Sequence, residues 1–252
     1  MNSSYKTTPS FRYPFANTEY TDLPSLTRAL AEHWDDGKNE LFTGALAEYF
    51  KFCNATLSEE AHQAEKAYKK DPLDADWIFL EFLCQADDTF HIFYCKGKPY
   101  PDVKILGQEI LQALSEQDFS ECHYFSGILR RGILPKYKNQ LLREARSAKA
   151  DAILEQIEDP VSENERTQTL NAYLLGYYLS GEVFLRVGDR TVKSISQLTQ
   201  YMKSLLDVSY ETFEDFCHTL IDYNDVLDIR FEAFLLALGK RDELLNWKNS
   251  LI

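Results

Sequence analysis

Hydrophobic and polar positions along the chain follow one arrangement three times: a short extended stretch, a turn, and then a helical pattern. Residues 90–95 and 182–187 are rich in aromatic and β-branched side chains, which favours β-strands. Gly97 and Gly188 follow these stretches, and glycine tolerates the positive φ that hairpin turns need. Asn17 takes the same place in the first copy, since asparagine also tolerates left-handed geometry. The pattern predicts three β-hairpins with equivalent turns, the third copy being one residue longer.

Each predicted hairpin leads into an amphipathic helix with a capping residue in front of it. The caps are Asp22, Asp102 and Ser194, whose side-chain oxygens accept hydrogen bonds from free N–H groups of the first helical turn. Apolar residues then recur at the i, i+3, i+4, i+7 spacing of a helix with one buried face. On that face, the positions that we expect to be equivalent are Leu26, Leu106 and Leu198.

Further helical patterns complete each copy. A helix rich in aromatic and leucine residues is expected near the end of each, within residues 77–83, 170–178 and 231–238, and two longer polar helices are predicted over residues 59–70 and 139–158. Because one such unit cannot close much core alone, neighbouring units should share a core. The sequence therefore predicts a mainly α protein with about 60% helix. Its fold class is a three-unit helical repeat in which a short β-hairpin opens each unit, with units 1–90, 91–181 and 182–252.

Two short motifs connect the copies with a known type of module. They consist of Phe93, Gly97, Lys98, Tyr100, Asp102 and Leu106, and of Leu41, Phe42, Gly44, Leu46, Tyr49 and Phe50. With these motifs the chain resembles a helical repeat module of uncharacterised bacterial proteins, similar to modules appended to bacterial Ser/Thr protein kinases and Hsp70-like proteins. The sequence contains neither a glycine-rich phosphate loop nor an HRD or DFG triplet. The resemblance therefore implies the accessory part without the enzyme.

Composition restricts the partners and the compartment that we expect. The net charge of −13 disfavours binding to the phosphate backbone of nucleic acids and to anionic membranes. The apolar runs are far shorter than the ~20 residues of a membrane-spanning helix, and the residues after Met1 do not resemble a signal peptide. Five cysteines without CxxC spacing are typical of reduced thiols in a cytosolic protein. We therefore expect a cytoplasmic location.

One segment of this acidic chain is strongly basic. Between residues 128 and 149 there are seven basic residues and one acidic residue, which leaves a charge of −19 for the rest of the chain. We interpret the segment as a docking face for another protein, acidic or phosphorylated, because arginine pairs bidentately with carboxylate and phosphate groups. The alternative is a solvated helix face that the protein's own acidic residues neutralise. The candidate partner-binding residues are Arg130, Arg131, Lys138, Arg143 and Arg146.

Catalytic and metal-binding patterns are weak. The adjacent pairs Cys122-His123 and Cys217-His218 direct their side chains to different helix faces, which disfavours a zinc site shared between them. HExxH, CxxC and GxSxG motifs do not occur, and paired acidic residues are typical of a solvated surface in a chain of this charge. We therefore predict no catalytic residue, no cofactor and no metal site.

The function that we expect is a non-catalytic protein–protein interaction scaffold or a regulatory accessory subunit of a bacterial cytoplasmic assembly, regulatory or defence-related. Two alternatives stay open. One is an enzyme whose site lacks short motifs and lies in a groove between repeats. The other is a nucleic-acid accessory that uses the basic segment 130–149.

Overall fold

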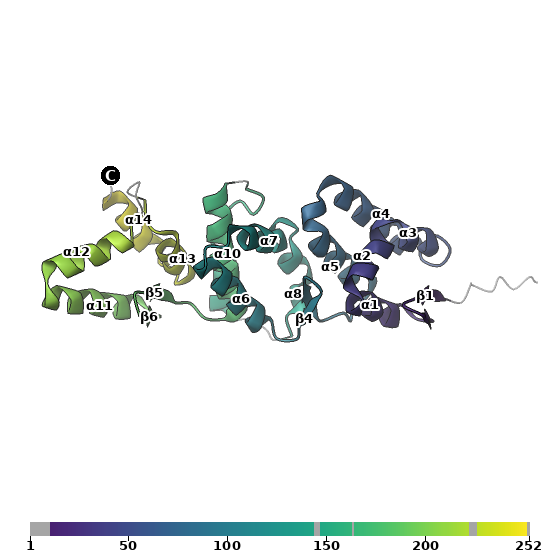
Figure 1. Cartoon of the computed structure of the whole chain (residues 1–252), viewed down its shortest axis with the longest axis horizontal. Coiled ribbons are helices and arrows are strands. Elements are labelled where there is room, and N and C mark those ends of the chain that lie inside the picture. The colour runs from purple at the N-terminus through teal and green to yellow at the C-terminus, as the bar shows by residue number, and fades with distance from the viewer. Residues whose placement is uncertain (1–10, 144–146, 163, 222–225, 251–252) are drawn as a thin grey trace, which may run out of the picture. The chain divides into compact units, whose positions relative to one another are not determined.

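The computed structural model describes residues 11–143, 147–162, 164–221 and 226–250 (Figure 1). It is 67% helix, and its described residues form 14 α-helices and three two-stranded antiparallel hairpins. The prediction of a mainly α fold with small hairpins is therefore confirmed. Within the described ranges, none of the helices combines the length and the apolar character needed to cross a bilayer.

The chain packs into two compact units. Residues 1–101 with 127–145 make up the N-terminal unit, and residues 102–126 with 146–252 make up the C-terminal unit. This division reflects spatial packing, whereas the repeat boundaries in the sequence reflect similarity between segments. The three repeat units therefore stay a prediction.

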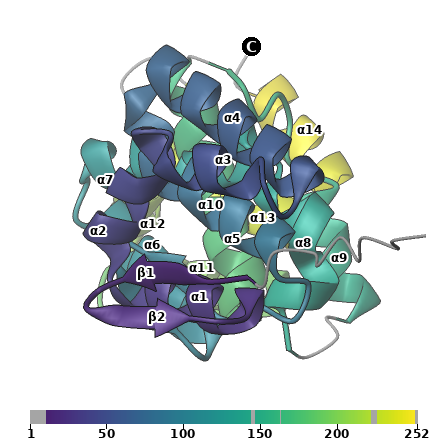
Figure 2. The same ribbon diagram turned by 90° about the vertical axis from the view of Figure 1, so that its right-hand side faces the viewer.

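The three hairpins have the same length and the same register. They pair β1 (Tyr13–Phe15) with β2 (Thr18–Tyr20), β3 (Phe93–Cys95) with β4 (Lys98–Tyr100), and β5 (Leu185–Val187) with β6 (Arg190–Val192). Figure 2 shows β1 and β2 lying beside the first helix, α1, which both strands contact. Only the second half of each predicted strand stretch, 90–95 and 182–187, takes part in pairing.

The turns confirm the predicted roles of glycine and asparagine, with one correction. Asn17 and Gly97 have φ values of 62° and 73° and are the second residues of their turns, whereas Gly188 (φ 59°) is the first residue of its turn. The extra residue expected in the third copy is therefore absent, because it came from aligning Gly188 with Gly97. The first paired residue lies nine positions before the helix cap in each copy: Tyr13 before Asp22, Phe93 before Asp102 and Leu185 before Ser194.

Each hairpin is followed by a helix that begins at the predicted cap. These helices are α1 (Leu23–Glu32), α6 (Val103–Ser115) and α11 (Ile195–Val208). Asp22 accepts a hydrogen bond from the backbone N–H of Ser25 at 2.8 Å, and Asp102 from that of Lys104 at 2.9 Å. Ser194 accepts one from the backbone N–H of Gln197 at 3.2 Å. The three caps satisfy donors that the first helical turn would otherwise leave unpaired.

The N-terminal unit is built around α5 (Ala75–Ala86), which is apolar on nearly all sides and buried. The helices that contact it are α1, α2 (Trp34–Phe42), α4 (Ala55–Lys70) and α8 (Ile133–Leu141). A short helix, α3 (Ala45–Phe50), packs on α2 and α4, and a 3₁₀ turn, Pro72–Asp74, precedes α5. The helices predicted over residues 59–70 and 77–83 are thus present as α4 and α5.

The C-terminal unit is built around α10 (Glu165–Ser180), which is buried along most of its length. It contacts α6, α9 (Ala148–Leu154) and α13 (Ile229–Ala237). The remaining helices are α7 (Phe119–Arg130), whose residues 127–130 belong to the N-terminal unit, α12 (Tyr210–Thr219) and α14 (Arg241–Ser250). Two glycines bring α6 and α10 together: a Cβ atom on Gly107 would lie 2.2 Å from the backbone nitrogen of Ser180, and one on Gly176 would lie 2.8 Å from Leu111.

The single helix predicted over residues 139–158 is wrong. α8 ends at Leu141, Leu142 has an extended backbone (φ −100°, ψ 99°), and α9 starts at Ala148. Leu141 and Leu142 are both buried, and Ser147 accepts a hydrogen bond from the backbone N–H of Ala150 at 3.2 Å. Ser147, which the sequence pattern placed inside one long helix, is therefore the N-cap of α9.

The close approach of α6 and α10 leads to a first prediction. Alanine normally stabilises a helix relative to glycine by about 1 kcal/mol. Gly107→Ala should nevertheless lower the free energy of unfolding by about 1–3 kcal/mol, because the new methyl group would meet backbone atoms of α10. Urea unfolding followed by circular dichroism measures this change.

The control is Thr199→Ala on α11, since Thr199 lies five residues after its cap, as Gly107 does, but is exposed. It should change stability by no more than about 0.5 kcal/mol. A Gly107→Ala protein as stable as the wild type would show that α6 and α10 do not meet at these glycines.

Candidate functional site

The structure places two of the predicted docking residues against the protein's own acidic groups. The guanidinium of Arg130 donates to Asp74 at 2.6 Å, and that of Arg131 donates to Glu81 on α5. Lys136 adds a second cation to Glu81 at 2.8 Å. Because Asp74 and Glu81 are buried, these contacts neutralise charges inside the N-terminal unit. For Arg130 and Arg131 they agree with the alternative interpretation of the basic segment, that the protein's own acidic residues neutralise it.

The other three candidates have different surroundings. Lys138 is half-buried, Arg143 is exposed, and Arg146 lies outside the described residues. A partner for the segment stays a prediction.

Two buried thiols, Cys84 and Cys122, and the exposed imidazole of His123 have surroundings that bear on chemistry. Burial raises the pKa of the Cys84 thiol and raises that of Cys122 to about 11, which favours the unreactive protonated form. His123 lies next to buried Cys122, but it is exposed and its Nδ1 is 3.1 Å from the side-chain oxygen of Gln168. In the ranges that the structure describes, no group of three His, Cys, Asp or Glu residues is placed to hold a metal ion.

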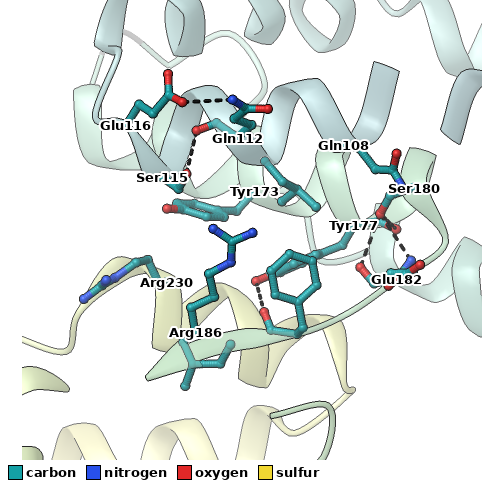
Figure 3. Close-up of a pocket in the computed structure, with 13 residues that line it drawn as sticks. Gln108, Gln112, Ser115, Glu116, Tyr173, Tyr177, Ser180, Glu182, Arg186 and Arg230 are labelled. Carbon is teal, nitrogen blue, oxygen red and sulfur yellow. Dashed lines mark hydrogen bonds between the residues drawn. The ribbon is translucent and has the colours of Figure 1, made fainter. Parts of the chain in front are cut away.

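A cleft in the C-terminal unit is a stronger candidate site (Figure 3). Its volume is about 700 Å³, which falls within the range of pockets that hold small molecules or peptide segments. One wall is α6, a second is the end of α10, and a third is the chain that leads into β5, with α13 at the rim. The polar and aromatic residues that line it are Gln108, Gln112, Ser115, Glu116, Tyr173, Tyr177, Ser180, Glu182, Phe184, Arg186 and Arg230.

Two arginines belong to this cleft, and they differ in their pairing. Arg230 donates from Nε and Nη2 to the two carboxylate oxygens of Asp228, at 2.8 and 3.0 Å, and this hydrogen bonding raises its pKa. Arg186 instead lies over the ring of Phe184, 5.8 Å from the ring centre, and no ion pair in the described residues includes it. Figure 3 shows its guanidinium pointing toward Tyr173. Arg186 is thus the cation that is open to a ligand.

Two tyrosines of α10 shape the floor of the cleft. Tyr177 donates its hydroxyl hydrogen to the backbone oxygen of Phe184 at 2.6 Å, which fixes the chain before β5 against α10. Burial raises the pKa of Tyr173 to about 12, so its phenol stays protonated at neutral pH and remains a hydrogen-bond donor. Both rings are almost completely buried, in agreement with the core spacing of these residues in the sequence.

The acidic groups of the cleft are held by neighbours. Gln112 donates to Glu116 at 2.9 Å, and Lys193 pairs with Glu182 at 3.2 Å. The lining residues contain carboxylates, amides, phenols and guanidinium groups, but neither cysteine nor histidine. This set suits recognition of an anionic ligand by hydrogen bonds and charge.

Sequence reasoning did not find the cleft. Its residues come from three segments near positions 110, 180 and 230, and none of them forms a local motif. Arg186 and Arg230 are single cations in otherwise mixed stretches, so a search for charge clusters passes over them. In the sequence, the one feature that points to the cleft is the spacing of Tyr173 and Tyr177 on α10.

Comparison with known proteins finds no match for this chain. No protein-family model matches the chain, no curated protein matches it, and no solved structure matches it. The resemblance to bacterial helical repeat modules therefore stays a proposal.

The ion pairs of α5 lead to a second prediction. Arg130→Met would leave the carboxylate of Asp74, which is 4% exposed, without its guanidinium partner. We expect a loss of about 3–5 kcal/mol in the free energy of unfolding, the usual effect of breaking a buried pair from one side. The double variant Arg130→Met with Asp74→Asn should recover part of this loss, because the unpaired charge is then removed.

Arg143→Met is the matched control, since Arg143 is exposed and comes from the same basic segment. Its stability should stay within about 0.5 kcal/mol of the wild type. Equal stability of the Arg130 and Arg143 variants in urea unfolding would contradict a structural role for the Arg130–Asp74 pair.

Proposed function

We propose that this chain is a non-catalytic interaction scaffold whose C-terminal unit binds an acidic segment of another protein in the cleft between α6, α10 and β5. The observation that carries the proposal is the guanidinium of Arg186, which points into the cleft and has no acidic partner among the described residues. A carboxylate or phosphate group of a ligand would complete its charge-assisted hydrogen bonds.

The rest of the cleft supports an extended peptide as the ligand. Gln108 and Gln112 carry side-chain amides, which both donate and accept hydrogen bonds, as a peptide backbone does. Leu111 and Phe184 add apolar contact area next to them. An extended segment with one acidic side chain near Arg186 therefore matches the lining in charge and in polarity.

A binding role suits these groups better than catalysis does. Burial raises the pKa of Tyr173 to about 12, so its phenol is protonated at neutral pH. It therefore does not supply the phenolate that a general base would need. Glu116 and Glu182 are engaged by Gln112 and Lys193. The proposal of a non-enzymatic protein therefore rests on the functional groups of the cleft.

We also propose that the chain contains three copies of one hairpin-and-helix module. The shared register and cap spacing of the hairpins support this idea, as does a second hollow of about 230 Å³ in the N-terminal unit. Arg28 lines that hollow six residues after its cap, as Gln108 does in the cleft. Tyr94 and Arg186, the middle residues of β3 and β5, also correspond. Repetition of one cleft is typical of proteins that bind extended partners.

The cellular setting that we propose rests on the resemblance to bacterial helical repeat modules. A module of this type would act as a regulatory or accessory subunit in a bacterial cytoplasmic assembly. The net charge of −13 supports a protein partner over nucleic acid.

A third prediction tests the cleft directly. Fluorescently labelled peptides that carry glutamate, phosphoserine or only neutral residues at matched positions are titrated with the protein, and binding is read by anisotropy. The acidic peptides should bind and the neutral ones should not. Arg186→Glu should weaken binding of the acidic peptides at least about tenfold, the effect of removing one charge-assisted contact and adding repulsion. The glutamate and phosphoserine peptides separate a carboxylate from a phosphate as the recognised group.

The control is Lys70→Glu, which makes the same charge change at an exposed residue of the N-terminal unit. It should leave the affinity unchanged, so any difference between the two variants measures the cleft and not net charge. Equal affinity of wild type and Arg186→Glu, or equal binding of neutral and acidic peptides, would exclude the proposed ligand.

A further inference from the structure

The hollow of the N-terminal unit lies between α1, the chain that follows α5, and β3. Pro24 and Arg28 line it from α1, and Phe90, Ile92 and Tyr94 line it from the chain that enters β3. Its volume of about 230 Å³ is below the range of pockets that enclose a whole small molecule. The hollow therefore suits one side chain of a larger ligand.

Arg28 is the cation of this hollow, and no ion pair in the described residues includes it. It is exposed, and its planar guanidinium carries N–H donors that match the oxygens of a carboxylate. Asp22 uses its carboxylate to cap α1. Glu32, one turn after Arg28, is exposed and does not line the hollow. An acidic group of a ligand would therefore meet a cation that holds no other carboxylate.

Tyr94 supplies a hydroxyl group to the same hollow. The residue is only 5% exposed, and its ring stacks on that of Trp34, with ring centres 5.4 Å apart. In the part of the chain that the structure describes, its hydroxyl has no hydrogen-bond partner, and its oxygen is not sealed off from solvent. Burial and the charge of Glu32 raise its pKa, whereas Arg28 opposes them, so the phenol stays a donor at neutral pH. A donor so deeply placed is stabilised when a ligand oxygen accepts from it.

The acidic residue that lines the hollow is already engaged. Asp87 is 9% exposed, and its Oδ1 accepts from the backbone N–H and the hydroxyl of Thr89, at 2.9 and 2.7 Å. Gln140 on α8 donates to the backbone oxygen of Asp87 at 2.8 Å, which holds this loop in place. Asp87 therefore leaves Arg28 to a ligand, but its charge disfavours a dianionic group such as phosphate.

The hollow and the cleft of the C-terminal unit contain the same pair of groups from different positions. Arg28 stands six residues after its helix cap, where the cleft has Gln108. Tyr94 is the middle residue of β3, where β5 has Arg186. In the cleft the phenol comes from Tyr173 on α10, which is 6% exposed. A guanidinium and a protonated phenol thus line both, so one kind of ligand group suits both.

We propose that this hollow is a second binding site of the chain, which takes the carboxylate of one acidic side chain from a peptide segment. Arg28 and the hydroxyl of Tyr94 supply N–H and O–H donors for its two oxygens. Phe90 and Ile92 add apolar contact for the methylene groups of that side chain. No residue lines both the hollow and the C-terminal cleft, so this site stands whether or not the cleft binds a ligand.

The experiment follows backbone amide shifts of the isotope-labelled full chain by nuclear magnetic resonance. One extended peptide carries a single glutamate among neutral residues, and a second carries glutamine in its place. The glutamate peptide should shift the amides of Arg28 and of residues 89–94, and the glutamine peptide should not. Tyr94→Phe should weaken the affinity read from these shifts about tenfold, because it removes a hydrogen bond to a charged group but keeps the ring. Arg28→Glu should weaken it at least about tenfold.

Tyr100→Phe is the matched control for the tyrosine, since Tyr100 is also 5% exposed and lies in the same hairpin but does not line the hollow. Lys70→Glu is the control for the charge change, at an exposed residue of the same unit. Both should leave the affinity unchanged. Equal affinity of the wild type and Tyr94→Phe, or equal shifts with the glutamate and glutamine peptides, would overturn the proposal.

The same titration separates this site from the C-terminal cleft. Arg186→Glu should remove shifts around Arg186 and leave those around Arg28 intact, so failure of one site does not decide the other. Acetate is the remaining occupant to test. If acetate shifts the amides around Arg28 with the same affinity as the glutamate peptide, a free carboxylate and not a peptide segment fills the hollow, against the proposal.

Discussion

Buried carboxylates on and next to the central helix of the N-terminal unit constrain the packing around them. Asp74, Asp76 and Glu81 are each at most 9% exposed, and an unpaired charge at such sites costs several kcal/mol. Trp34 and Lys38 donate to Asp76 at 2.9 and 2.8 Å, which positions α2. Arginines of the basic segment neutralise the other two, which positions the start of α8. The excess of positive charge between residues 128 and 149 is thus in part a structural requirement.

The C-terminal unit also contains a buried carboxylate that is paired with an arginine. Glu232 on α13 is buried and accepts a hydrogen bond from Arg166 on α10 at 2.7 Å. The contact between α6 and α10 depends instead on two glycines, since close packing of backbones requires the absence of a Cβ atom. Because α10 is held so near α6, its last turn and the chain before β5 form a walled cleft with Arg186 inside it. The close approach of α6 and α10 therefore both packs the C-terminal unit and forms the walls of the proposed binding site.

Local patterns in the sequence predicted local structure well. The hairpins, their turns and the caps Asp22, Asp102 and Ser194 depend on groups within a few residues of one another, so the order of residue types is sufficient to predict them. The break after Leu141 escaped the same reasoning. Helical propensity is nearly uniform there. The helix ends because Leu142 is buried with an extended backbone, and a second helix begins because Ser147 caps it.

The sequence by itself determined that the chain is mainly helical, where three hairpins turn, and that one segment is basic, but not the break in the helix predicted over residues 139–158. Only the tertiary structure decided what those groups contact. Arg130 meets Asp74 across 56 residues of chain, and Arg186 faces the cleft while Arg230 is held by Asp228. The physical reason is that capping and turn geometry act over a few bonds, whereas burial and charge pairing depend on which surfaces meet after the chain has folded.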